Sequence, residues 1–360
     1  MLVFFLNSNT LALFLVKFKG DPMISEYEVV FPTTTIQYLS ANIDDITTKP
    51  MLLFFHGFPE CSWAWATYLH AMSIDYCVIA PDLPGYGCSN GFKSTDEYNI
   101  GNLIQLMAGF VEQMLIKSAQ QINSTPQKVH LVAHDWGGAI AWPLVAFHGT
   151  LFHSLSIINA AHPSAFTREM RDNAIQQEKS EYIADFMHAD AASKVKANDF
   201  SMFKKLFGPQ FFPPELEDMD TIAANLDNSA HRNKNKTYGL FSQRQLTEYN
   251  RQWNNPKSLE NMLNYYRKMP QIKTKGYVSQ QAPLKIPNIR INLPTLVIWG
   301  ENDSAFVIDN LLGLDKWVPN LHICKISGAT HWVHHEQPEH IMNLLNEFLT
   351  QVVVDNDIDI

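Results

Sequence analysis

Short apolar runs alternate with longer amphipathic stretches along most of this chain. Runs of five to seven residues, rich in β-branched and aromatic side chains, predict strands at 26–31, 35–41, 51–55, 76–80, 128–133, 155–159, 295–299 and 322–326. Apolar positions at helical spacing predict helices at 98–117, 138–148, 307–313 and 338–352. Such alternation is typical of a mostly parallel sheet with helices on both faces, so we expect a doubly wound, eight-stranded α/β fold.

The middle of the chain breaks this alternation. No strand pattern recurs across residues 164–285, which are polar, helical in tendency and rich in aromatic residues, with Pro163 on one side and Pro283 and Pro287 on the other. We interpret this segment as a helical cap inserted between the sixth and seventh strands. The two parts of the core would then be 23–163 and 286–360.

The first 22 residues do not fit the core. They are apolar as far as Val16, and Lys17 and Lys19 follow the apolar stretch rather than precede it, as they would in a signal peptide. The stretch is also too short to span a bilayer comfortably. We therefore expect residues 1–22 to be an extension outside the fold, and no stable membrane insertion. The alternative is a membrane anchor.

Composition excludes some functions. The net charge is −9 and no strongly basic run occurs, which argues against a nucleic-acid partner. Hydrophobic residues make up 46% and charged residues 18%, as in ordinary globular enzymes. The four cysteines are scattered without a C-x-x-C motif, so we expect reduced, mostly buried thiols in a cytoplasmic protein.

One carboxylate stands between the fifth predicted strand and the next helix. Asp135 lies on that turn, and Gly137 and Gly138 follow it. A reactive side chain on a sharp strand-to-helix turn is typical of a nucleophile elbow, here A-x-D-x-G instead of G-x-S-x-G. A carboxylate is suited to displacing a leaving group from saturated carbon, which gives an ester intermediate. The alternative is that Asp135 only caps the helix.

The third predicted strand supplies a second element of such a site, because it runs into the motif H-G-F-P at 56–59. In elbow enzymes one oxyanion-binding N–H belongs to the residue after the nucleophile, and another to a loop after an earlier strand. Trp136 and Phe58 are the matching donors. The alternative for H-G is a simple tight turn.

The last two predicted strands lead to an acid and to a histidine. Asp303 follows the seventh strand, with Glu301 as its rival, and His331 lies in a glycine-containing loop after the eighth. The order Asp135, Asp303, His331 is the order of nucleophile, acid and base in elbow enzymes. The rival histidines are His322, His334 and His335.

These segments resemble the α/β-hydrolase superfamily, and within it the epoxide hydrolase branch. The resemblance extends from about residue 23 to about residue 349. It rests on H-G-F-P (56–59), D-L-P-G-Y-G-x-S (82–89), A-H-D-W-G-G (133–138), W-G-E-N-D (299–303) and G-A-T-H-W (328–332). H-D-W-G narrows it to members with an Asp nucleophile, which include haloalkane dehalogenases.

Two tyrosines of the predicted cap distinguish epoxide hydrolysis from dehalogenation. N-Y-Y-R at 264–267 resembles the epoxide hydrolase motif whose tyrosine before Arg protonates the epoxide oxygen, and Tyr266 matches it. K-S-E-Y-I at 179–183 resembles the segment that carries a second such tyrosine, which Tyr182 matches. Phenols with a pKa near their usual value of about 10 can bind and protonate an alkoxide, whereas a halide needs no proton. The alternative for both is helix packing.

The resemblance implies that a small hydrophobic epoxide and water become a vicinal diol through an ester on Asp135, with no metal or organic cofactor. His331, oriented by Asp303, would activate the water. We expect a monomer or homodimer. The predicted walls of the substrate pocket are His56, Pro59, Trp136 and Phe186.

Two rival functions remain. A haloalkane or haloacetate dehalogenase would use the same nucleophile, but the cap tyrosines argue against it, and no arginine directly follows Asp135 to hold a haloacetate carboxylate. The second rival function is that of a non-catalytic ligand receptor. The intact set of Asp135, Asp303 and His331 argues against it.

Overall fold

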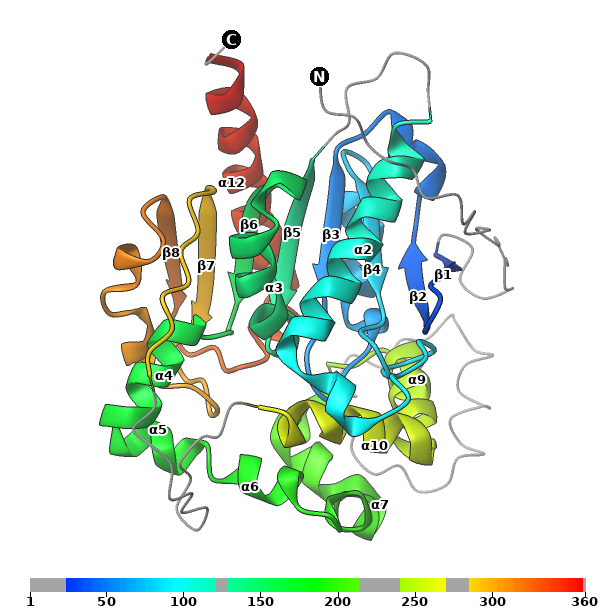
Figure 1. Cartoon of the computed structure of the whole chain (residues 1–360), viewed down its shortest axis with the longest axis vertical. Coiled ribbons are helices and arrows are strands. Elements are labelled where there is room, and N and C mark those ends of the chain that lie inside the picture. The colour runs from blue at the N-terminus through cyan, green and yellow to red at the C-terminus, as the bar shows by residue number, and fades with distance from the viewer. Residues whose placement is uncertain (1–23, 121–127, 214–239, 270–284, 359–360) are drawn as a thin grey trace, which may run out of the picture.

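The computed structural model describes residues 24–120, 128–213, 240–269 and 285–358, and the expected extension at 1–22 lies outside these ranges. A central sheet is covered by helices on both faces, and a further group of helices lies beyond one end of the strands (Figure 1).

The sheet has eight strands in the order β1-β2-β4-β3-β5-β6-β7-β8. The ladders β1–β2 and β2–β4 are antiparallel and all others are parallel, which confirms the predicted mostly parallel sheet. The central strands are buried along their length, which explains their nearly continuous apolar sequences. The strands are β1 (Ser25–Val30), β2 (Thr35–Ser40), β3 (Met51–Phe55), β4 (Cys77–Pro81), β5 (Val129–His134), β6 (Phe152–Ile158), β7 (Thr295–Gly300) and β8 (Leu321–Ile326).

Helices cover both faces of this sheet. On one face, α2 (Ile100–Ser118) packs against α3 (Trp136–Phe147). On the other, α1 (Ala66–Met72) packs against α12 (Pro338–Ile358), which runs behind the sheet in Figure 1. The doubly wound arrangement predicted from the sequence is therefore confirmed.

The chain described between β6 and β7 forms helices and no strand, which confirms the helical insertion; we call residues 163–267 the cap. The cap lies beyond the carboxyl ends of the parallel strands (Figure 1), where doubly wound sheets bind their ligands. The α-helices in the described part of the cap are α4 (Pro163–Asp172), α5 (Ala174–Lys179), α6 (Tyr182–Met187), α7 (Ala191–Phe207), α9 (Gln243–Asn254) and α10 (Pro256–Arg267).

The prediction of an α-helix at 307–313 is wrong. The chain forms two short 3-10 helices instead, η6 (Ile308–Leu311) and η7 (Leu314–Lys316). Gly313 separates them with φ 64°, a left-handed conformation that ends a helix. The Asn310 side chain also donates to the Val307 carbonyl at 2.9 Å, so a side chain competes with the helical backbone pattern.

The four cysteines are free thiols, but only Cys61 and Cys77 are buried, while Cys88 and Cys324 are half-buried. Within the described ranges, no helix is both long and apolar enough to cross a bilayer.

Candidate active site

Asp135 occupies a tight turn between β5 and α3. Its φ of 49° and ψ of −119° lie in a region that residues with a side chain rarely adopt. The side chain stays 11% exposed although both neighbouring residues are buried. Asp135 accepts no capping hydrogen bond from α3, so a helix cap does not account for it.

Two glycines let the loop after β3 reach this turn. A Cβ on Gly57 would lie 2.4 Å from Cβ of Asp135. A Cβ on Gly137 would lie 2.6 Å from the carbonyl oxygens of Phe55 and His56. Both distances are too short for real side chains, so glycine is required at each position.

One backbone N–H binds the Asp135 carboxylate, and the N-terminus of α3 begins directly after it. The Phe58 N–H donates a hydrogen bond to Oδ1 of Asp135 at 2.7 Å. Trp136 is the first residue of α3, so its N–H belongs to the helix N-terminus, where N–H groups lack intrahelical acceptors. The helix end carries a partial positive charge that favours an anion here.

His331 bridges two carboxylates. Its Nδ1 lies 2.8 Å from Oδ2 of Asp303, and its Nε2 lies 3.6 Å from Oδ2 of Asp135. Asp303 is 2% exposed, and its Oδ1 accepts from the N–H groups of Ala305 at 2.6 Å and Phe306 at 2.9 Å. The structure thus brings the three residues Asp135, Asp303 and His331 together.

The carboxylates of Asp303 and Asp135 determine the charge of His331. Burial opposes a positive charge on His331, but Asp303 and then Asp135 outweigh burial and raise the pKa of His331 to about 10. Burial alone would raise the pKa of Asp303, but His331 and Asn159 lower it below its usual value. The resting site therefore holds an imidazolium at neutral pH. Glu301, the rival acid, is exposed.

Asn159 is a positioning residue that the sequence analysis missed. It follows β6 with φ 40° and is fully buried. Its Nδ2 donates to Oδ2 of Asp303 at 2.7 Å, and its Oδ1 accepts from the Gly300 N–H at 2.8 Å. Asn159 therefore fixes the oxygen that faces His331. The only signal in the sequence is an amide directly after an apolar strand.

Glu60 was also not predicted from the sequence. It lies close to several histidines. Nε2 of His335 lies 2.5 Å and Nε2 of His334 lies 3.5 Å from Oε1 of this buried carboxylate. Nδ1 of His134 lies 3.3 Å from Oε2, and its Nε2 contacts the His331 carbonyl at 3.0 Å. His334 and His335 are thus engaged with Glu60, and the cluster joins the elbow to the loop that carries His331.

Tyr182 and Tyr266 come from two cap helices and meet Asp135 at one small cavity. Tyr182 begins α6 and Tyr266 lies in the last turn of α10, with ring centroids 6.2 Å apart. Both rings and Asp135 line a chamber of about 80 Å³. Burial raises the pKa of both phenols, and the Asp135 charge adds to that effect, so both stay protonated at neutral pH.

Of the two aromatic residues predicted as pocket walls, Trp136 lines this chamber and Phe186 does not. The ring of Trp136 meets that of Tyr266 edge to face at 5.3 Å. Phe186 lies behind the tyrosines, with its ring centroid 5.0 Å from that of Tyr266 and 5.5 Å from that of Tyr182.

The structure corrects the placement of His56 and Pro59, which do not line the chamber. His56 is fully buried, and its Nε2 accepts from the Leu83 N–H at 3.0 Å. The Pro59 carbonyl accepts from Nε1 of Trp253 at 2.8 Å. H-G-F-P thus presents its backbone to the site, while these two residues hold neighbouring segments in place.

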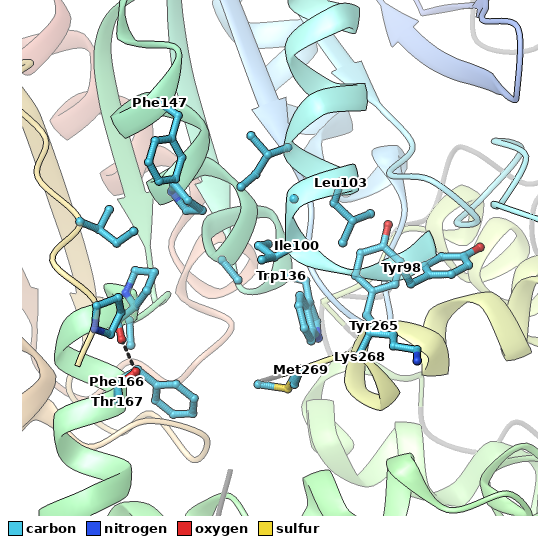
Figure 2. A pocket seen from close by; sticks show the side chains of 18 of the residues that line it. Tyr98, Ile100, Leu103, Trp136, Phe147, Phe166, Thr167, Tyr265, Lys268 and Met269 are labelled. Carbon is cyan, nitrogen blue, oxygen red and sulfur yellow. Dashed lines mark hydrogen bonds between the residues drawn. The ribbon is translucent and has the colours of Figure 1, made fainter. Parts of the chain in front are cut away.

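A second cavity, of about 570 Å³, adjoins the chamber between α2, α3 and the cap. Figure 2 shows Trp136 near its middle, Phe147 at one side, and Tyr98 and Leu103 across from it. The walls that it shares with the chamber are Trp136, Ala139, Ala161, Phe166 and Met269.

Sequence comparison identifies similar proteins over most of the chain. The model of the family described as alpha/beta hydrolase fold matches residues 50–338. The AB hydrolase superfamily protein YfhM of Bacillus subtilis (strain 168) is 27% identical over 302 residues, which cover 83% of this chain and 90% of that protein. Epoxide hydrolase 1 of Caenorhabditis elegans is 26% identical over 318 residues, covering 88% and 68%.

Solved structures are similar over most of the chain. The Bacillus megaterium epoxide hydrolase, solved in complex with an inhibitor, is 25% identical with a TM-score of 0.70, covering 90% of this chain and 99% of that one. A mutant of that enzyme complexed with its naphthyloxy-propanediol product is 25% identical with a TM-score of 0.65, covering 88% and 97%.

Proposed function

This chain belongs to the α/β-hydrolase fold family, and we propose that it is an epoxide hydrolase that forms vicinal diols. The observation that carries the proposal is the single chamber lined by the Asp135 carboxylate and by the phenols of Tyr182 and Tyr266. A nucleophile and two protonated acids in one cavity are what ring opening requires. Similarity to proteins named epoxide hydrolases supports it.

In the first step, Asp135 attacks the less hindered epoxide carbon and the C–O bond of the ring breaks. Tyr182 and Tyr266 bind the developing alkoxide, and one of them supplies its proton. Because burial keeps both phenols protonated, the acid form is present at neutral pH. The product is a hydroxyalkyl ester on Asp135.

Ester formation changes the charge around His331. It removes the Asp135 negative charge, which is one of the causes that raise the pKa of His331 to about 10. The imidazolium can then lose its proton to the tyrosinate, directly or through water, and become a base. His331, held by Asp303, takes a proton from water, and the hydroxide attacks the ester carbonyl. The N–H groups of Phe58 and Trp136 stabilise the oxyanion. The ester C–O bond then breaks, the leaving diol oxygen takes a proton from the protonated His331, and the new carboxylic acid of Asp135 returns its proton to His331.

Trp136 favours a second candidate, a dehalogenase, because its indole lines the chamber and an indole N–H can hold a halide. That reaction would leave the two phenols without a chemical role.

Turnover distinguishes the two reactions. Purified protein would be incubated with styrene oxide, 1,2-epoxyhexane, 1-bromobutane and fluoroacetate, while diol and halide are measured, with Asp135→Asn as the inactive control. We expect diol from the epoxides and little halide. Halide release without diol would establish the dehalogenase instead.

A further inference from the structure

The larger cavity is the main feature that the proposed reaction leaves unexplained. Its volume of about 570 Å³ is in the range of roughly 300–1,000 Å³ that is usual for pockets that enclose small molecules, whereas the chamber has about 80 Å³. The chamber therefore accommodates an epoxide ring with a short substituent. A larger substrate must extend beyond the chamber.

The two spaces are neighbours at the nucleophile. Trp136 and Ala139, which both spaces share, belong to the first turn of α3, directly after Asp135. Met269, another shared wall, lies close to Trp136 in Figure 2. A substituent on the epoxide carbon would have to pass these shared walls to reach the larger cavity.

The walls of the larger cavity are mainly hydrocarbon. Apolar side chains come from α2, α3 and α4, and include Ile100, Leu103, Ile104, Pro143, Phe147 and Phe166.

Several polar groups of these walls have partners within the protein. The Thr167 hydroxyl donates to the Pro163 carbonyl at 2.7 Å. Lys268, the one lysine among the described lining residues, pairs with Asp96, and no carboxylate side chain is among them. An uncharged chain is therefore matched by most of this lining, whereas a carboxylate would meet a lysine that already pairs with Asp96.

We propose that the substrates are terminal epoxides on a long, uncharged hydrocarbon chain. This inference rests on the proposed function. The epoxide ring occupies the chamber, with its unsubstituted carbon facing Asp135, and the chain lies in the larger cavity along α2 and α3.

Chain length is the direct test. The kcat/KM of the wild-type enzyme would be measured for 1,2-epoxybutane, 1,2-epoxyoctane and 1,2-epoxydodecane. We expect a rise of roughly three- to fourfold for each methylene that enters the cavity. 11,12-Epoxydodecanoic acid should be a poorer substrate than its methyl ester. A flat series, or a free acid as good as its ester, would overturn the inference while diol formation still supports the proposed function.

A matched pair of variants links the effect to the cavity. Leu103 lines the larger cavity and not the chamber. Leu103→Trp should lower the ratio of kcat/KM for epoxydodecane over epoxybutane by roughly tenfold or more, whereas Leu103→Met, which nearly keeps the volume, should leave it unchanged. An unchanged ratio in a folded Leu103→Trp protein would place the chain elsewhere.

Product binding tests the cavity without turnover. Butane-1,2-diol and dodecane-1,2-diol would be titrated into wild-type protein by calorimetry. Tighter binding of the longer diol, lost in Leu103→Trp, supports occupancy of the cavity even if the proposed reaction fails. Equal affinities for the two diols would show that the hydrocarbon chain does not occupy the larger cavity, whichever reaction the protein catalyses.

Discussion

The backbone N–H of Phe58 donates a 2.7 Å hydrogen bond to Oδ1 of Asp135. The other oxygen, Oδ2, faces His331 at 3.6 Å. This asymmetry gives the two oxygens different roles in the proposed reaction. Oδ2 attacks the epoxide, and Oδ1 stays at Phe58 as the ester carbonyl oxygen, where the oxyanion of the second step develops.

The origin of the new diol oxygen tests this assignment. In a single turnover in oxygen-18 water, with enzyme in excess, we expect an unlabelled diol because its oxygen comes from Asp135. Label should enter the carboxylate instead, and reach the diol in later turnovers. Mass spectrometry of the diol and of the Asp135 peptide measures both. Full labelling of the first diol would mean that water opens the ring directly.

Removing the proposed base should trap the intermediate. His331→Gln should still be alkylated but should not hydrolyse the ester, so intact mass should increase by one substrate, located on the Asp135 peptide. Asp135→Asn is the control that should gain no mass. Normal turnover by His331→Gln would transfer the role of base to another residue, with His334 and His335 the first to examine.

The cap tyrosines should control ring opening. A hydrogen bond to a developing oxyanion contributes about 2–4 kcal/mol, so Tyr182→Phe or Tyr266→Phe should slow alkylation roughly 30- to 1000-fold, and the double variant should nearly abolish it. Stopped-flow measurement of alkylation reports this step. Tyr265→Phe, assayed with 1,2-epoxybutane, is the matched control. Its hydroxyl donates to the Pro84 carbonyl at 2.8 Å, and Tyr265 lines the larger cavity but not the chamber, which a short epoxide occupies. A double variant with the wild-type rate would reduce both tyrosines to packing residues.

The charge of His331 predicts a pH-dependent stability. Because the pKa of His331 rises from 6.5 to about 10 on folding, its pairing with Asp303 and Asp135 stabilises the fold fully below about pH 6.5. This contribution is lost as pH rises towards 10. The difference in free energy of unfolding between wild type and His331→Gln, measured in urea, should therefore be larger at pH 6 than at pH 10. A difference that is constant or grows with pH would contradict the assigned charge.

Asn159 should affect the second step more than the first. Asn159→Leu leaves the buried Gly300 N–H and Oδ2 of Asp303 without their amide partner, which should lower the free energy of unfolding by about 1–3 kcal/mol. Hydrolysis should slow more than alkylation, because Asn159 acts through Asp303 on His331. Equal slowing of both steps would indicate a purely structural role.

The sequence predicts the parts of this molecule that have a repeating or ordered pattern. Short apolar runs predicted all eight strands, although only the central ones are buried along their length. The order of Asp135, Asp303 and His331 along the chain indicated residues that the structure places together. The prediction of a helix at 307–313 was wrong because the spacing of apolar residues does not reveal that the glycine at its end adopts a positive φ.

Single polar residues carry no such pattern. Asn159 and Glu60 were missed because their partners lie far away in sequence: Asp303 is 144 residues from the first, and His335 is 275 residues from the second. His56 was misplaced for a related reason, since a motif identifies a segment but does not show whether its backbone or its side chains face the site.

Asp135 and His331 stand on loops of the sheet, whereas Tyr182 and Tyr266 stand on cap helices. In the proposed reaction, the residues that attack the epoxide and then hydrolyse the ester belong to the sheet. The residues that protonate the leaving oxygen, and then accept the proton of His331, belong to the cap. Exchange of the cap would thus redirect the enzyme to a new electrophile while Asp135 and His331 stay as they are.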